Sequence, residues 1–419
     1  MNEQNHTIEA PIPVLLLGLD QGLFDAERSM DELAALCQAN HMQAAARLVQ
    51  RKAAPEAGTV LGEGKLAEAR LYCENLQVQA AVFDGELSGS QLRNISDALG
   101  VEVLDRTMLI LEIFRSRAVT NEGKVQTELA LLRYRLPRLA GLGEALSRQG
   151  GGGGGGAGAR RGAGESKLEY DRRHVRRRIE ALEQKLAELE KRRGENRRAR
   201  QRAGTPVISL VGYTNVGKSS LLNALCGAQA LEADMLFATL DPTARRLTLP
   251  SGLNVILVDT VGFVSRLPHK LVEAFKSTLE EAAFSDVIVK VADSADPERE
   301  TQLEVTDGVL AELGCAGIPQ LTVYNKCDKA GAVAFAPGVL LASAKTGRGL
   351  PQLLQKLDEA LADRVRPVRL LLPYDKLSLA EPMRSRGSVT KEDYQESGVY
   401  FEGFVKSTDL HLYLPYLTQ

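Results

Sequence analysis

One short stretch of the sequence restricts the fold more than any other. An apolar run, Val207–Val211, leads into the pattern G-x-x-x-x-G-K-S over 212–219, and a helical pattern follows in 220–225. In this strand–loop–helix context the glycines turn backbone N–H groups inward around phosphates, and the helix N-terminus adds partial positive charge. The lysine reaches the β and γ phosphates, and the serine hydroxyl binds Mg²⁺. The predicted phosphate-binding residues are Gly212, Tyr213, Thr214, Asn215, Val216, Gly217, Lys218 and Ser219.

A second buried strand pattern, Val255–Val258, is followed by the sequence D-T-V-G. The carboxylate of Asp259 is suited to the coordination shell of Mg²⁺. The N–H of Gly262 can bind the γ-phosphate and respond to its loss. On the loop between the two motifs, the hydroxyl of Thr239 can complete Mg²⁺ coordination only while the γ-phosphate is present. The further predicted nucleotide-binding residues are Phe237, Ala238, Thr239, Leu240, Asp241, Asp259, Thr260, Val261 and Gly262. Among all these, the predicted catalytic residues are Lys218, Thr239 and Gly262, and the predicted metal ligands are Ser219 and Thr239.

Two later motifs predict that the bound base is guanine. The carboxylate of Asp328 can accept hydrogen bonds from N1–H and the 2-amino group of guanine. Adenine lacks this pair of donors and would leave the carboxylate unpaired, which is costly. Lys326 can lie over the plane of the base, and the N–H of Ala344 can bind guanine O6. The predicted base-binding residues are Asn325, Lys326, Cys327, Asp328, Ser343, Ala344 and Lys345.

Basic charge is concentrated in the middle of the chain. Residues 121–202 carry 21 Lys and Arg against 11 Asp and Glu, a net +10. Residues 1–120 carry 10 against 17, a net −7, and residues 203–419 carry 21 against 26, a net −5. The central segment alone therefore suits a partner with many phosphates.

The same segment has two narrow apolar stripes with heptad spacing, over 125–139 and 175–189, separated by seven consecutive glycines at 150–156. Glycine loses too much backbone entropy for such a run to hold a helix. We therefore predict an antiparallel helical hairpin whose two seams face each other and whose tip is a mobile loop. Pro137 is expected to kink or end the first helix, and Gly194 to end the second.

The arginines of the hairpin have two interpretations. They can form a solvated helix face, helped by interleaved glutamates, or a surface for nucleic acid. A glycine tip over 150–162 favours the second, because bare backbone edged by arginine can enter a phosphate-lined cavity, and RNA is bound largely by shape and phosphate contacts. The arginines at the tip are Arg148, Arg160 and Arg161.

Residues 12–118 alternate short apolar runs with amphipathic stretches, which predicts βαβ units and a parallel sheet. Gly62-Glu63-Gly64-Lys65 lies at the start of one predicted helix. It can be an anion-binding helix N-terminus or a loop turn, and the turn is favoured because the longer phosphate-binding pattern is missing. The predicted strands are Val14–Leu19, Ala44–Val49, Ala80–Phe83 and Val101–Leu104, and the predicted helices lie near 25–39, 64–76 and 88–99.

Several classes of protein are excluded by what the chain lacks. Its longest N-terminal apolar stretch, Ile12–Leu19, is far shorter than the roughly 20 residues of a bilayer span, and no signal peptide is recognised. The five cysteines are scattered without a C-x-x-C pair, which argues against a disulfide framework or a zinc site and for a reduced cytoplasm. The five histidines are isolated and show no metal spacing.

The order G-x-x-x-x-G-K-S, D-T-V-G, N-K-C-D and S-A-K resembles the Ras-like GTPase superfamily over about 206–362. Together with F-A-T-L-D-P-T at 237–243, the Gly62–Lys65 motif and the basic glycine-tipped segment, nearly the whole chain resembles the HflX family of ribosome-associated GTPases. The resemblance implies GTP hydrolysis coupled to binding the large ribosomal subunit and its rRNA, and to splitting stalled or idle ribosomes. We expect a cytoplasmic monomer that binds no DNA and does not enter the membrane.

The predicted fold class is multidomain α/β, with a division that follows these motifs. An N-terminal parallel α/β domain takes 1–119, and the basic helical hairpin takes 120–203. A Ras-like P-loop G domain takes 204–365, and a small α+β domain, with strands at Val368–Leu372 and Val399–Val405, takes 366–419.

Two positions bear on the mechanism. Phe263 follows D-T-V-G where many Ras-like GTPases carry a water-orienting Gln, and a phenyl ring cannot hydrogen-bond to water. We therefore predict slow hydrolysis by the protein alone and stimulation by ribosomes, since a partner-supplied charge can be worth about 10³–10⁵ in rate. Asn215 resembles the asparagine that binds K⁺ in potassium-activated relatives; the alternative is that it stabilises a turn.

The leading alternative function is a GTPase that acts on another RNA or on a tRNA-modification partner. A peripheral membrane GTPase is less favoured, because its basic helix should carry a broad apolar face and the seams here are narrow. A metabolic kinase is disfavoured, because N-K-C-D selects guanine and no motif for an acceptor substrate is evident.

Overall fold

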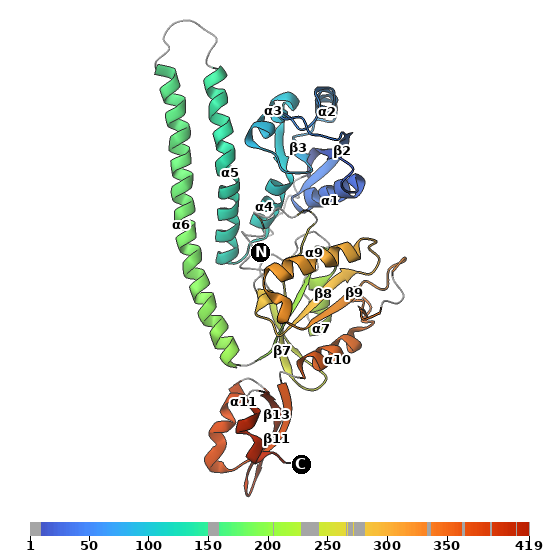
Figure 1. Ribbon diagram of the computed structural model, residues 1–419, viewed down its shortest axis with the longest axis vertical. Coiled ribbons are helices and arrows are strands. Elements are labelled where there is room, and N and C mark those ends of the chain that lie inside the picture. The colour runs from blue at the N-terminus through green and yellow to red at the C-terminus, as the bar shows by residue number, and fades with distance from the viewer. Residues whose placement is uncertain are drawn as a thin grey trace, which may run out of the picture. The chain divides into compact units, whose positions relative to one another are not determined.

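The computed structural model describes residues 10–149, 159–203, 205–227, 243–264, 266, 271, 281–332, 337–362, 365–385, 388–407 and 409–418. The chain forms two compact units, the first built from residues up to Ala187 and the second from Glu188 onward, apart from two short segments assigned to the first. Figure 1 labels the elements of both units.

The first unit starts with an α/β part. Its elements are β1 (Ile12–Asp20), α1 (Ala26–Ala39), β2 (Met42–Arg51), α2 (Glu63–Asn75), β3 (Ala80–Phe83), α3 (Gly89–Leu99), β4 (Glu102–Asp105) and α4 (Arg106–Arg117). The strands form one parallel sheet in the order β2-β1-β3-β4. Residues 14–17 of β1 are fully buried, as expected of a central parallel strand with a continuous apolar run. The predicted parallel α/β part is confirmed. The ends of every predicted strand and helix lie within two residues of the ends of an observed element.

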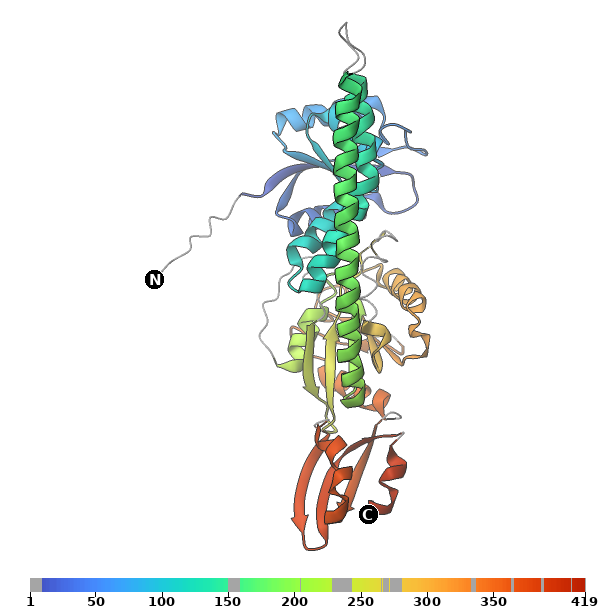
Figure 2. The same ribbon diagram turned by 90° about the vertical axis from the view of Figure 1, so that its left-hand side faces the viewer.

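Two long helices follow, α5 (Asn121–Gln149) and α6 (Ala159–Ala203), of which α6 passes from the first unit into the second at Glu188. Figures 1 and 2 show α5 and the first half of α6 lying side by side as an antiparallel pair. Ion pairs join them at Arg178–Glu128, 2.7 Å, and Arg133–Glu183, 2.6 Å. The predicted hairpin is confirmed. Its seam is buried at Val125, Leu129, Ile179 and Leu182.

One detail of the predicted hairpin is wrong, and a second is settled only in part. Pro137 lies inside α5, which continues to Gln149, so the proline does not end the helix; the alternative, that it kinks the helix, stays a prediction. Helix α6 does not end at Gly194 but continues to Ala203. A helical glycine costs only about 1 kcal/mol, and the Arg, Glu and Ala residues that follow are strong helix formers. Residues 150–158 of the predicted tip lie outside the described residues.

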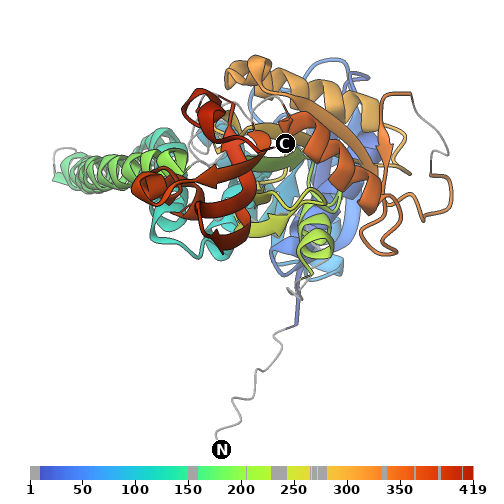
Figure 3. The ribbon, with the colours of Figure 1, turned by 90° about the horizontal axis from the view of Figure 1, so that it is seen from below.

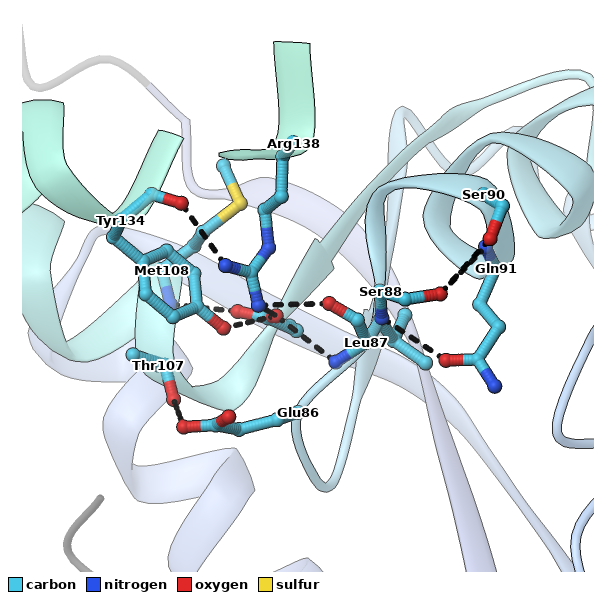
Figure 4. Close-up of polar contacts among 10 residues, drawn as sticks. Glu86, Leu87, Ser88, Ser90, Gln91, Thr107, Met108, Tyr134 and Arg138 are labelled. Carbon is cyan, nitrogen blue, oxygen red and sulfur yellow. Dashed lines mark hydrogen bonds and ion pairs between the residues drawn. The ribbon is translucent and has the colours of Figure 1, made fainter. Parts of the chain in front are cut away.

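A buried polar cluster fixes α5 to the α/β part, and Figure 4 shows its contacts. The guanidinium of Arg138 lies 3.4 Å from the centre of the Tyr134 ring and donates to Leu87 O at 2.7 Å. Both Tyr134 and Arg138 also reach the carboxylate of Asp105 at the end of β4. A Cβ on Gly89 would lie 2.8 Å from Arg138 O, so the close approach of α3 to α5 requires glycine there.

The second unit contains a six-stranded sheet. Its elements are β5 (Val207–Gly212), α7 (Lys218–Cys226), β6 (Thr243–Thr248), β7 (Asn254–Asp259), β8 (Val287–Asp293), α9 (Arg299–Glu312), a 3-10 turn (Cys315–Gly317), β9 (Gln320–Asn325), β10 (Leu340–Leu341) and α10 (Leu350–Leu361). The strand order is β10-β9-β8-β5-β7-β6, in which only β6 is antiparallel to its neighbour. The carboxyl ends of the parallel strands therefore meet at one edge, where open α/β sheets bind ligands.

The end of the chain forms a small α+β part, the red ribbon of Figures 1 and 3. Its elements are β11 (Val365–Leu372), a 3-10 helix (Tyr374–Leu379), α11 (Glu381–Ser385), β12 (Val389–Gln395), β13 (Gly398–Lys406) and two 3-10 turns (Leu410–Leu412 and Leu414–Tyr416). The antiparallel order is β11-β13-β12. The two predicted strands are confirmed as β11 and β13. Phe404 of β13 is buried in the core of the six-stranded sheet, which attaches this part to its neighbour.

Over the described residues, no helix is long and apolar enough to cross a membrane. No group of three or more His, Cys, Asp and Glu side chains among them could hold a metal ion. All five cysteines are free thiols.

Candidate nucleotide-binding site

The glycine loop joins the end of β5 to the start of α7 and needs glycine at two points. A Cβ on Gly212 would lie 2.2 Å from Val291 O, and one on Gly217, whose φ is 88°, would lie 2.4 Å from Asn325 Nδ2. The loop therefore approaches strands β8 and β9 more closely than a side chain allows. Because α7 begins at Lys218, the N–H groups of its first turn have no intrahelical acceptor and can bind phosphate oxygens.

Lys218 is a buried ammonium within this loop. Its Nζ donates to Gly212 O at 3.0 Å and to Tyr213 O at 2.7 Å, and the residue is 6% exposed. Burial lowers the pKa of Lys218 to about 8, although the negative charge of Asp259 opposes the shift. A bound phosphate would place negative charge beside this buried ammonium and would therefore favour its charged form.

Two oxygen ligands suited to Mg²⁺ lie together beside this lysine. The Oγ of Ser219, in the first turn of α7, donates to Oδ2 of Asp259, the last residue of β7, at 2.6 Å. Hydroxyl and carboxylate oxygens are ligands that Mg²⁺ prefers. The residues present at this edge therefore fit the metal that the sequence predicts.

The base-binding motif is tied to the phosphate loop through Asn325 at the end of β9. Its Nδ2 donates to Val216 O at 2.9 Å, and its Oδ1 accepts the N–H of Ala344 at 3.1 Å. This N–H donates to Asn325 here, and its expected binding to guanine O6 stays a prediction. Lys326 has a φ of 61° and donates to Asn215 O, so a second bond joins the two motifs.

Asp328 is held in its ionised form. Its Oδ1 accepts the hydroxyl of Ser343 at 2.6 Å, and this hydrogen bond lowers the pKa of Asp328, with smaller contributions that include the nearby charge of Lys345. The N–H of Cys327 donates to Ala342 O at 3.1 Å, which joins the two base-binding segments. An ionised carboxylate is what recognition of the N1–H and 2-amino donors of guanine requires.

The D-T-V-G motif lies directly against the phosphate loop. A Cβ on Gly262 would be 2.8 Å from the Cα of Thr214 and 2.9 Å from Lys218 Nζ. Phe263 donates its N–H to Gly212 O at 3.1 Å and accepts the N–H of Thr214 at 2.6 Å. Its ring is 2% exposed and packs edge-on against that of Tyr213, with the ring centres 6.5 Å apart.

Within the described residues, the structure thus brings together the predicted positions of all four motifs. Thr260 and Val261 are both buried beside them. The predicted loop of Phe237, Ala238, Thr239, Leu240 and Asp241 lies outside the described residues, so its expected role in binding Mg²⁺ and phosphate stays a prediction.

One further residue at this site, Asp293, was not predicted from the sequence; its Oδ2 lies 2.9 Å from Lys326 Nζ. An available signal was its place at the end of an apolar run that only Lys290 interrupts, Val287–Ala292, next to the strand that ends in Asn325.

The Gly62–Lys65 motif of the first unit forms the start of α2, with Gly62 as the N-cap. The N–H of Gly62 donates to Gln50 Oε1 at 2.8 Å, and Lys65 pairs with Glu68 at 2.8 Å. These contacts give the motif a local structural role. Its interpretation as an anion-binding site stays a prediction.

A largely parallel sheet that gathers a phosphate loop, a Ser–Asp pair and a guanine-type N-K-C-D motif at one edge defines a P-loop GTPase. Models of known families match the chain in three parts: "GTP-binding GTPase N-terminal" over residues 27–115, "GTP-binding GTPase Middle Region" over 117–200 and "50S ribosome-binding GTPase" over 207–326. The GTPase HflX of Caldanaerobacter subterraneus is 47% identical over 374 residues, which cover 89% of this chain and 86% of the relative. The GTPase HflX of Escherichia coli is 38% identical over 388 residues, which cover 90% and 89%.

This chain therefore belongs to the HflX family of GTPases, and its enzymatic activity is the hydrolysis of GTP. Among solved structures, a GTP-binding protein of Sulfolobus solfataricus in complex with GDP is similar over 83% of this chain and 98% of its own, with 25% identity and a TM-score of 0.46.

Proposed function

We propose that this GTPase binds the large ribosomal subunit in its GTP form, splits stalled or idle ribosomes, and is released by hydrolysis. The observation that supports this most strongly is the combination of a GTPase domain matched by the "50S ribosome-binding GTPase" model with a hairpin segment of net charge +10. Ribosomal RNA supplies the phosphates that such a charge requires. A ribosomal partner also places the protein in the cytoplasm, where we expect it to act as a monomer.

The hairpin supports an RNA partner better than a lipid one. In the part of the hairpin whose side chains the structure describes, most apolar side chains of α5 are buried in the seam with α6 or against α3 and α4, so this part has no broad apolar face for a membrane. Two of its acidic side chains, Glu128 and Glu183, are taken up in ion pairs between the helices. The exposed basic residues of α6 include Arg173, Arg177, Lys185, Lys191 and Arg192.

In the proposed reaction each motif has one task. Lys218 binds the β and γ phosphates, and Ser219 with Asp259 would hold Mg²⁺, to which Thr239 adds a hydroxyl. A Mg²⁺ ion held by these residues would neutralise charge on the phosphates. Gly262 meets the γ-phosphate and releases its segment on hydrolysis, as in other GTPase switches.

The ring of Phe263 is buried against Tyr213 and offers no hydrogen bond to water. We therefore expect slow hydrolysis by the protein alone and stimulation by ribosomes. In other enzymes of this chemistry, a charge supplied by a partner raises the rate by about 10³–10⁵. K⁺ is a further proposed cofactor, on the resemblance of Asn215 to a K⁺-binding asparagine. Equal rates in K⁺ and Na⁺ buffers would remove it.

Titration of purified ribosomal subunits tests the proposal. The protein with a non-hydrolysable GTP analogue should bind the large subunit tightly, and with GDP weakly; equal binding in the two states would contradict the switch. The double variant Arg173→Glu/Arg177→Glu should weaken binding and reduce its salt dependence. Lys356→Glu, an exposed charge reversal on α10, is the control. Tight binding of tRNA or another RNA in place of the subunit would favour the alternative function.

A further inference from the structure

We infer that Asp293 is a positioning residue for guanine-nucleotide binding, because it holds the Lys326 ammonium between the phosphate loop and the base-binding motif. Asp293 ends β8, and Asn325 lies opposite it in the parallel register of β9. The side chain of Asp293 therefore starts beside the N-K-C-D motif, although it belongs to none of the four nucleotide motifs.

The two oxygens of this carboxylate have different partners. Oδ1 accepts the N–H of Ala295 at 3.0 Å, which shapes the turn after β8. Oδ2 lies 2.9 Å from the Nζ of Lys326 and 3.2 Å from the Nζ of Lys329. One oxygen thus serves the local backbone, and the other faces two ammonium groups.

The two lysines differ in how far their side chains are exposed to solvent. The side chains of Asp293 and Lys326 are 15% and 20% exposed, whereas that of Lys329 is 50% exposed. A charged hydrogen bond shielded from solvent contributes more than one at the surface. The Asp293–Lys326 pair is therefore the stronger of the two, and Lys329 adds little to it.

The other contact of Lys326 links this ion pair to nucleotide binding. Its Nζ also donates to the carbonyl oxygen of Asn215, which lies in the phosphate loop at a φ of 60°. With one ammonium bridging Asp293 and Asn215, the lysine stem is held in one place relative to both the base and the phosphates. Preorganisation of this kind raises affinity because less side-chain entropy is lost on binding.

The substitution Asp293→Asn tests this inference. Asparagine keeps a side-chain oxygen for the Ala295 N–H and removes the charge that faces Lys326. We expect the dissociation constant of GDP and the KM of GTP to rise about tenfold, the loss typical of one shielded charged hydrogen bond, with kcat within about twofold of the wild type. The matched control is Asp307→Asn on α9. It removes a carboxylate that pairs, at 2.7 Å, with Lys290 of β8, the strand that Asp293 ends.

A double-mutant cycle separates positioning from a merely structural role. Lys326→Met keeps the alkyl stem and removes the ammonium, so Asp293→Asn should have no further effect on GDP affinity in that background. In a Lys329→Met background the tenfold effect should persist. Asp293→Ser, which also retains a short acceptor, serves as a second variant if Asp293→Asn does not fold. Unchanged GDP affinity in Asp293→Asn, or an equal loss with and without Lys326, would overturn the inference.

Discussion

The hydroxyl of Tyr134 on α5 donates a 2.5 Å hydrogen bond to Oδ2 of Asp105 at the end of β4. Asp105 is completely buried and also accepts the backbone N–H groups of Leu87 and Met108. Burial raises the pKa of Asp105, and the bonds from Tyr134 and the backbone oppose the shift. The middle of α5 is therefore attached to the α/β part by a polar contact between residues 29 positions apart.

Tyr134→Phe should destabilise the first unit. The change removes one donor from a buried carboxylate but keeps the ring under Arg138, so the expected loss is about 1–3 kcal/mol in the free energy of unfolding. Urea denaturation followed by circular dichroism measures it. Tyr170→Phe, on an exposed part of α6, should stay within about 0.5 kcal/mol of the wild type. Equal effects of the two substitutions would contradict the role assigned to this hydroxyl.

The sequence predicts features that depend on neighbouring residues better than contacts between residues far apart in the chain. The phosphate loop, the strands of the first sheet, strands β5 and β7 of the second and the hairpin seams follow from local patterns, whereas β6, β8 and β10 were not predicted. The Asp105–Tyr134 and Asp293–Lys326 contacts join residues that only the fold brings together, so a local pattern can mark the end of a strand at Asp293 but cannot reveal its partner. Strand β12 was missed because its residues, V-T-K-E-D-Y-Q, are mostly polar and exposed. The helix end predicted at Gly194 was wrong because the helix-forming residues around this glycine outweigh its local cost of about 1 kcal/mol.

Asp328→Asn should change the preference of the site from guanine to xanthine. The carboxylate is kept ionised by the hydrogen bond from Ser343, and an amide cannot accept from both N1–H and the 2-amino group in the same way. Loss of two charged hydrogen bonds should weaken GTP binding roughly 10²–10⁴-fold. Competition of XTP and GTP for the variant measures the change. Retained selection for GTP over XTP would show that another group reads the base.

GDP binding should take up a proton near pH 8. The pKa of Lys218 is lowered to about 8 by burial, and the phosphates would raise it again in the complex. The free protein loses this proton as the pH rises through about 8, while the complex keeps it, so GDP affinity should fall between about pH 7 and about pH 9. Calorimetry in buffers of different ionisation enthalpy measures the uptake. Uptake that does not change over this range would mean that Lys218 stays charged without a ligand.

The same shift has a consequence for stability without nucleotide. Because the folded pKa of Lys218 lies below its unfolded value, its contribution to stability is present at high pH and is lost as the pH falls through about 8. A saturating concentration of GDP should therefore stabilise the second unit more at pH 7 than at pH 9, in terms of the midpoint of urea denaturation.

Shortening the run of glycines at 150–156 should separate nucleotide chemistry from action on the ribosome. The run lies between the end of α5 at Gln149 and the start of α6 at Ala159, whereas all the described nucleotide-binding residues belong to the second unit. GDP affinity and hydrolysis by the protein alone should therefore be unchanged, and splitting of ribosomes should be lost, because a shortened tip cannot reach into a phosphate-lined cavity. Light scattering of ribosomes with GTP measures the splitting. Wild-type splitting by the shortened variant would show that the charged helices act without the tip.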